Sequence, residues 1–407
     1  MAIRLTYVIL LTLMLFVLYR AGKSLQVRYK IWSSAGIAAI LAYTLNEGLR
    51  FGRGIDCVYG MLGYEDIILG YKSKVYIGYY YLEYFLGSKL GLPYQYLILT
   101  LSFMFILGTL FLMKNYKEVL PFALPLFLLV SCSTVENLMK WWLAFSFVMI
   151  GLYYQMISGK KNIHPKFLLW SAISLLFHPA TFPIPIIIYF LYRKDKPLMK
   201  PLWAIALFFF ISFFFQASFM QQFAGFVNTL STLNERFAGY ADNTEYWLMK
   251  APGGVLRGAL PGIAETTCLC LIVYIGYKAV LSAEKKYIFA YNLFIIGFLF
   301  FPIGRQIELI LRFDQVFMFF RAIILAYIIK VVYQEKRMYL EPTFAIGAFL
   351  VFLWWGTSFF RAPFTKDPQQ LLYVWNSEGI SHETIMQIYM DNKYDKADKY
   401  GTEVQTK

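Results

Sequence analysis

The sequence predicts an all-α polytopic integral membrane protein, and three observations lead to this fold class. The 407 residues are 59% hydrophobic and only 15% charged, whereas soluble globular domains carry about 25% charged residues. Apolar stretches about as long as a bilayer is thick recur along the whole chain. Basic residues outnumber acidic ones, 38 to 24, and half of them lie in short segments between the apolar stretches. This composition excludes a soluble enzyme, a disordered chain and, with only four cysteines, a disulfide scaffold.

The apolar stretches predict about 12 transmembrane helices. No cleavage site follows the first stretch, residues 2–19, so we expect an uncleaved helix rather than a signal peptide. The other stretches are 31–46, 95–113, 119–130, 141–157, 167–192, 201–219, 258–281, 287–303, 313–333 and 340–359. We expect a transmembrane domain over residues 1–359, with long outward loops at 47–94 and 220–257, and an extracytoplasmic tail at 360–407.

Basic residues orient the helices, because Lys and Arg concentrate in cytoplasmic loops. Nineteen of the 38 basic residues lie in six short segments, 20–30, 114–118, 159–166, 193–200, 278–286 and 330–337. We expect all six segments to be cytoplasmic and both termini to lie outside. Half of the basic residues behind the net charge of +14 are thus explained without a nucleic-acid partner.

The stretch 167–192 is predicted to form a hairpin of two short helices rather than one crossing. Basic segments flank it on both sides, and one crossing cannot leave both ends in the cytoplasm. Pro179, Pro183 and Pro185 break a helix, because each lacks the N–H and clashes with the preceding turn. His178 is then expected at the outer tip, in a pocket that shields the broken backbone from lipid.

The densest outward charge cluster follows the second helix and contains Arg50, Arg53 and Asp56, with glycines at 52 and 54. If the helix continues, Arg50 and Arg53 lie on one side of it, where their planar donors suit phosphate oxygens. The glycines let a ligand approach the backbone closely. Asp56 either orients an arginine or accepts a proton from a sugar hydroxyl. The alternative is that these charges snorkel to the membrane interface.

Further candidate residues lie at the outer ends of other helices. His178 is a candidate proton acceptor or hydrogen-bond donor to phosphate; the alternative is that it satisfies carbonyls freed at the helix break. Lys140 either faces an anionic headgroup or anchors its helix beside two tryptophans. Arg305 and Arg312 flank an outward turn, and Arg312 is expected to start the eleventh helix, where the helix dipole favours anions.

The outward loop 220–257 supplies Arg236, Tyr240 and Arg257 as candidate substrate-binding residues. Its aromatic rings either stack on sugar faces or form an interfacial belt. The sequence has no phosphate-binding loop, no dinucleotide-binding turn and no Asp-x-Asp metal pair, and its cysteines lack zinc spacing. We therefore expect no cofactor, no metal and no nucleic acid, and an anionic, lipid-anchored substrate handled from the outer side.

These motifs, taken together, resemble those of the EpsG-type, Wzy-like bacterial polysaccharide polymerases. The motifs are Arg50-Phe51-x-x-Gly54-x-Asp56, Lys140-x-x-Leu143-Ala144, Phe177-His178-Pro179-Ala180 and Arg312. In that order they are similar to the family's Arg-aromatic-x-x-Gly-x-Asp signature, its Arg-Gln-x-hydrophobic-Ala start, its His-x-Ser-Ala element and an arginine that opens a late helix. Lys140 departs from the family by replacing an arginine, which removes a bidentate phosphate contact.

The resemblance implies a GT-C-like glycosyltransferase that joins oligosaccharide repeat units linked to undecaprenyl pyrophosphate, on the outer face of the bacterial inner membrane. It implies metal-independent transfer with the lipid pyrophosphate as leaving group. The implied partners are lipid-linked donor and acceptor glycans, membrane lipid, a chain-length regulator and a flippase. The expected catalytic residues are Arg50, Asp56, His178 and Arg312, with Asp56 or His178 as the base. The expected substrate-binding residues are Arg53, Lys140, Arg236, Tyr240, Arg257 and Arg305.

Three other functions stay open at this stage. A membrane glycosyltransferase that uses a polyprenyl-monophosphate-linked single sugar is usually marked by acidic residues in the first outward loop, here Glu47, Asp56, Glu65 and Asp66. A transporter or flippase for lipid-linked sugars predicts inverted repeats and charges that line a path through the bilayer. An acyltransferase of surface sugars requires a histidine–arginine pair and a cytoplasmic acyl donor.

Overall fold

The structure is a computed structural model that describes residues 2–51, 55–70, 76–137, 139–214, 260–304 and 308–333, and singly 347 and 374. Within these ranges every regular element is a helix. Five segments are long and apolar enough to cross a membrane, namely Leu5–Val27, Tyr94–Ser131, Met139–Ser158, Lys285–Gly304 and Ile310–Val332. Shorter apolar helices cover Pro165–Phe177, Pro179–Tyr192 and Pro201–Phe214. The predicted fold class, an all-α polytopic membrane protein, is therefore confirmed for the described residues.

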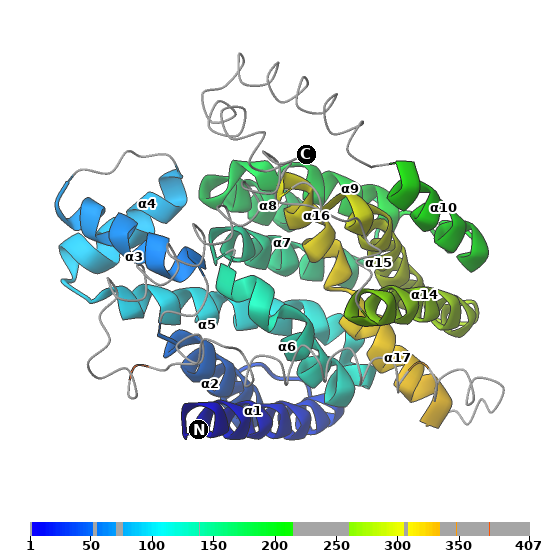
Figure 1. Ribbon diagram of the computed structural model, residues 1–407, viewed down its shortest axis with the longest axis horizontal. Helices are drawn as coiled ribbons and strands as arrows, with labels where there is room; N and C mark the ends of the chain where they lie inside the picture. The colour runs from blue at the N-terminus through cyan, green and yellow to red at the C-terminus, as the bar shows by residue number, and fades with distance from the viewer. Residues whose placement is uncertain are drawn as a thin grey trace, which may run out of the picture.

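The first group of helices packs side by side in one part of the molecule (Figure 1). It consists of α1 (Ala2–Val27), α2 (Ser34–Gly48), α5 (Tyr94–Met113), α6 (Leu120–Asn137) and α7 (Met139–Ser158), and the 3-10 turn η2 (Lys114–Val119) joins α5 to α6. Lipid is as apolar as the buried side chains, so close packing holds such helices together. A Cβ atom on Gly108 of α5 would lie 2.7 Å from the Ser146 carbonyl oxygen of α7, and glycine allows this approach.

The second group surrounds α15 (Lys285–Gly304), which packs against α10 (Pro201–Phe214), α14 (Leu260–Val280) and α16 (Glu308–Met318). A Cβ atom on Gly297 of α15 would lie 2.6 Å from the Met318 amide nitrogen, so α15 and α16 are in backbone contact.

The prediction of one helix at 313–333 is wrong. The structure has two helices there, α16 and α17 (Arg321–Tyr333), separated by a break at Phe319 and Phe320. The Phe319 ring packs 4.4 Å from the ring of Phe127 in α6, centroid to centroid, and 6.2 Å from that of Trp142 in α7. Through these contacts, the break between α16 and α17 packs against α6 and α7 of the first group of helices.

The predicted hairpin is present. It consists of α8 (Pro165–Phe177), the 3-10 turn η3 (Pro179–Thr181) and α9 (Pro183–Tyr192), and His178 ends α8 with an extended backbone. The Lys161 ammonium, before the hairpin, lies 3.0 Å from the Asp195 carboxylate, which follows it. The chain therefore enters and leaves the hairpin on the same side of the molecule.

Five of the six basic segments meet on this side, which we call the basic face. Lys161 and Lys285 both pair with the Asp195 carboxylate, at 3.0 and 2.7 Å. Lys286 pairs with the Glu118 carboxylate at 3.0 Å, and the Gln26 side-chain amide donates a hydrogen bond of 2.8 Å to the Glu118 carbonyl. Hydrogen bonds from Lys285 and Lys161 lower the pKa of Asp195, which favours its ionised form. Exposed pairs of this kind add little stability, but they agree with the shared side predicted for these segments.

Cysteines placed at the two ends of the hairpin test this topology. In a cysteine-free background, we expect Lys161→Cys and Asp195→Cys to crosslink with a short bismaleimide, because their side chains are in contact. A membrane-impermeant thiol reagent should label both from one side only. A control cysteine at Lys89, in the segment that follows α4, should react from the other side and form no crosslink with position 161. Labelling of positions 161 and 195 from opposite sides would contradict the hairpin.

The segment 47–94, predicted as a loop, is largely helical where the structure describes it. It contains α3 (Ile55–Ile68), α4 (Ile77–Tyr84) and a short π-helix (Phe85–Lys89). α3 and α4 lie at the left of Figure 1, beyond the end of α2. A Cβ atom on Gly78 of α4 would lie 3.1 Å from the Leu176 carbonyl oxygen, so α4 packs against the end of α8.

Two other predicted segments lie largely outside the described residues. The loop 220–257 lies wholly outside them, and of the stretch 340–359 only residue 347 is described. In the tail 360–407 only Val374 is described, and its amide donates a hydrogen bond to the Leu49 carbonyl at 3.0 Å. This contact brings one residue of the tail next to Arg50.

Candidate functional site

The candidate site lies on the face opposite the basic face, which we call the far face. α2 and α8 start at the basic face and end at the far face, whereas α5 and α7 run the other way, because each leads into a basic segment. The far face thus contains the end of α2, the hairpin tip and the first turn of α7.

Arg50 lies just beyond the end of α2. The helix ends at Gly48 with Leu49 as its C-cap, so it does not continue through Arg50 and the predicted helical turn is wrong there. Arg53 lies outside the described residues. The Gln95 side-chain amide of α5 donates hydrogen bonds to the carbonyls of Gly48 and Arg50, the latter at 3.2 Å. These bonds fix the chain where it leaves the helix.

The Arg50 side chain is buried, with 1% of its surface exposed. Its Nη1 donates a hydrogen bond of 2.8 Å to the Glu47 carbonyl and lies 3.7 Å from Glu47 Oε2. Asn46 Nδ2 donates a hydrogen bond of 2.8 Å to Glu47 Oε1. Arg50 Nε has no hydrogen-bond acceptor among the described residues. A buried donor without an acceptor costs about 1–3 kcal/mol, so a ligand rich in acceptor oxygens would bind favourably here.

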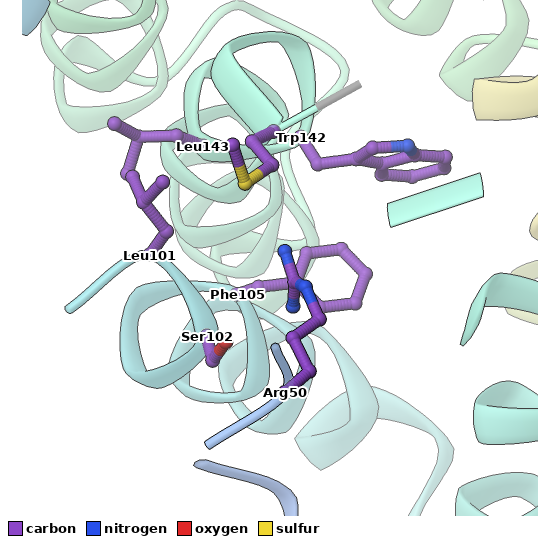
Figure 2. Close-up of a pocket in the computed structure, with 7 residues that line it drawn as sticks. Arg50, Leu101, Ser102, Phe105, Trp142 and Leu143 are labelled. Atoms are coloured by element: carbon purple, nitrogen blue, oxygen red, sulfur yellow. The ribbon is translucent and has the colours of Figure 1, made fainter. Parts of the chain in front are cut away.

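The guanidinium group of Arg50 extends into a small cavity between α5 and α7 (Figure 2). The other lining residues are Leu101, Ser102 and Phe105 of α5 and Met139, Trp142 and Leu143 of α7. Arg50 is the single charged residue among them. Apolar walls lower the local dielectric constant, which strengthens the attraction between this charge and an anion.

His178 packs at the hairpin tip and is 5% exposed. Its ring centroid lies 5.0 Å from that of Trp141 in α7 and 5.1 Å from that of Tyr76, at the start of α4. The Thr181 amide and hydroxyl donate hydrogen bonds of 3.0 and 2.8 Å to the His178 carbonyl. Thr181 therefore satisfies the carbonyl of His178 itself at the helix break.

Lys140 lies in the first turn of α7, over two tyrosines at the start of α4. Its Nζ lies 4.6 Å from the ring centroid of Tyr79 and 5.5 Å from that of Tyr76. Cation–π contacts of this type help to hold an ammonium group in place. Tyr76 contacts both Lys140 and His178, so these two candidate residues pack against the same tyrosine.

Arg312 lies in α16, and the residue after it, Phe313, contacts the first turn of α7. The Phe313 ring lies 5.4 Å from Trp141, centroid to centroid. Because α16 begins at Glu308, Arg312 is in its second turn, and the prediction that Arg312 opens a helix is wrong. Asp314 is 1% exposed and interacts electrostatically with Arg321 at the start of α17.

The first turn of α7 is thus the point where the candidate residues converge. Met139 and Trp142 face Arg50, Lys140 faces the tyrosines, and Trp141 lies between His178 and Phe313. Asp56 lies in the first turn of α3, and its side chain is outside the described residues. Four other candidate residues, Arg236, Tyr240, Arg257 and Arg305, lie outside the described ranges altogether.

Some contributors to the site were missed by sequence reasoning. From the sequence, Trp141 stands out only as one of the two tryptophans beside Lys140, and no role is predicted for Tyr76 and Tyr79, although their spacing of three residues places them on one helix face. Glu47 was considered as an acid of an alternative enzyme rather than as the partner of Arg50. Within the described part of the chain, no group of three or more His, Cys, Asp or Glu residues could hold a metal ion.

The fold and the site together define a multi-pass helical membrane protein with buried and aromatic-held cations on one face. The chain belongs to the EpsG family, whose model matches residues 35–366, more than half of its length. This confirms the predicted resemblance and indicates a polysaccharide polymerase. No curated protein and no solved structure matches the chain.

Proposed function

We propose that the protein joins oligosaccharide repeat units linked to undecaprenyl pyrophosphate, on the outer face of the bacterial inner membrane. A donor chain on its lipid pyrophosphate is transferred to a hydroxyl of a second lipid-linked unit, so the chain grows by one repeat unit per cycle. The membership in the EpsG family supports the class of reaction. The placement of the candidate residues supports the site.

The transfer exchanges one carbon–oxygen bond for another. The acceptor hydroxyl oxygen attacks the anomeric carbon of the donor, and the bond from that carbon to the pyrophosphate oxygen breaks. The lipid pyrophosphate leaves with the electron pair, and the hydroxyl proton moves to a base on the protein. The protein therefore has to stabilise negative charge on the leaving group and accept one proton.

Arg50 is assigned to the leaving group because it is a buried cation in an apolar cavity with an N–H group, at Nε, that lacks an acceptor among the described residues. Lys140 and Arg312 are assigned to the second pyrophosphate, which the acceptor carries. His178 or Asp56 is assigned as the base. His178 packs against Trp141, which lies in the same turn of α7 as Lys140 and as the residues that line the Arg50 cavity. The convergence of these residues at the first turn of α7 is the observation that carries the proposal.

A reconstitution experiment separates this function from its alternatives. The purified protein is placed in liposomes with a lipid-linked repeat unit that carries a radiolabelled glycan, and glycan length is measured by gel electrophoresis. We expect a ladder of products that differ by one repeat unit. A flippase would move the label across the bilayer without changing glycan length. A monophosphate-dependent glycosyltransferase would add single sugars and only from a polyprenyl-phosphate sugar. Either of these results would overturn the proposal.

A further inference from the structure

The partner of Arg50 is itself buried. Glu47 is 1% exposed, its Oε2 lies 3.7 Å from Arg50 Nη1, and its Oε1 accepts a hydrogen bond from Asn46 at 2.8 Å. The proposed leaving-group site thus contains a fixed negative charge directly beside the cation that has to bind an anion.

The carboxylate is not the group that orients the guanidinium. The hydrogen bond of Arg50 Nη1 goes to the backbone carbonyl of Glu47, at 2.8 Å, and Gln95 holds the backbone at Arg50. Neither contact involves the Glu47 carboxylate, so we expect both to persist when that side chain loses its charge. The remaining effect of the carboxylate is electrostatic, because it lowers the positive potential that an anion meets at Arg50.

We propose that Glu47 is a counter-ion that limits the affinity of Arg50 for the lipid pyrophosphate, so that this leaving group is released after each transfer. The inference rests on the proposed function and assigns Glu47 as a positioning residue that acts through Arg50. A buried arginine without a counter-ion would hold the pyrophosphate product tightly and slow the next cycle. With Glu47 present, Arg50 Nε remains available for the ligand, while the neighbouring carboxylate offsets part of the attraction between Arg50 and the anion.

The test compares pyrophosphate affinity in the wild-type protein and in Glu47→Gln, which keeps the size of the side chain and removes its charge. The probe is farnesyl pyrophosphate, titrated into purified protein in nanodiscs by isothermal titration calorimetry. We expect the Kd of Glu47→Gln to fall roughly tenfold, the size expected when one like charge is removed at close range. With a lipid-linked repeat unit as substrate, later turnovers should slow relative to the first, because the pyrophosphate product leaves more slowly.

The competing account, in which Glu47 only supports local structure, predicts the opposite sign. Weaker or unchanged binding by Glu47→Gln would overturn the inference. Glu47→Asp keeps the charge and should bind like the wild type. Glu47→Met serves as a second neutral variant if Glu47→Gln does not fold. Glu118→Gln, which removes the acid of an ion pair on the basic face, should leave the Kd unchanged.

Arg50→Ala separates the two proposals. If the wild type binds farnesyl pyrophosphate and folded Arg50→Ala protein does not, the leaving-group site stands and the Glu47 variants decide the inference alone. If Arg50→Ala binds as tightly as the wild type, the assignment of Arg50 fails, and the proposed role of Glu47 fails with it.

Discussion

Chain elongation is expected to fall about 100-fold or more when Arg50 is replaced by alanine, because one fixed donor to a developing oxyanion contributes a factor of this size. Arg50→Lys keeps the charge but loses the planar set of donors, so we expect an intermediate loss. The measurement is glycan length and amount in cells that lack the native gene.

Arg50→Ala also leaves Glu47 buried without its partner, and breaking a buried ion pair costs about 3–5 kcal/mol. The double variant Glu47→Gln with Arg50→Gln removes both charges and should restore folding without restoring elongation. Arg193→Ala, an exposed arginine that follows α9, is the matched control and should elongate normally. Normal glycan length in the folded double variant would show that Arg50 does not act on the leaving group.

Replacing His178 with phenylalanine is expected to have the second large effect on chain elongation. The phenyl ring keeps the packing between Tyr76 and Trp141, but it removes the nitrogen atoms that accept and donate protons. If His178 is the base, elongation should fall roughly 100- to 10,000-fold, while the amount of folded protein in the membrane stays near that of the wild type.

His164→Asn is the control for this variant. His164 caps α8 at the basic face, where its Nδ1 accepts a hydrogen bond from the Lys166 amide, and asparagine can replace that cap. Elongation at the wild-type rate in His178→Phe would exclude His178 as the base and leave Asp56, which Asp56→Asn would then test in the same assay.

The hairpin was predictable because its determinants are local. Three prolines break the helix at fixed positions, and basic residues on both sides force both ends to one face. The structure places Lys161 in contact with Asp195, as this reasoning requires.

The break between α16 and α17 was not predictable in this way. Phe319 and Phe320 stand in a largely apolar stretch without proline or glycine, which is typical of one continuous helix. The break coincides with packing of Phe319 against Phe127 and Trp142 from other helices, and such tertiary contacts leave no local signal.

In the candidate site, too, the residues were predictable from the sequence and their packing was not. The charges at Arg50, Lys140 and His178 were visible in the sequence as residues rare in membrane helices. Their convergence on one turn of α7 depends on how α2, α7 and the hairpin pack. The Glu47–Arg50 pair has helical spacing in the sequence, but its geometry depends on where α2 ends, and Gln95 of another helix contacts that end.

The most direct test of the account is the position of a bound polyprenyl pyrophosphate, determined by cryo-electron microscopy of the protein in nanodiscs with farnesyl pyrophosphate. We predict that the cavity between α5 and α7 widens and contains phosphate density, with an oxygen about 3 Å from Arg50 Nε. Phosphate density bound instead at the basic face, with the Arg50 cavity closed, would contradict it.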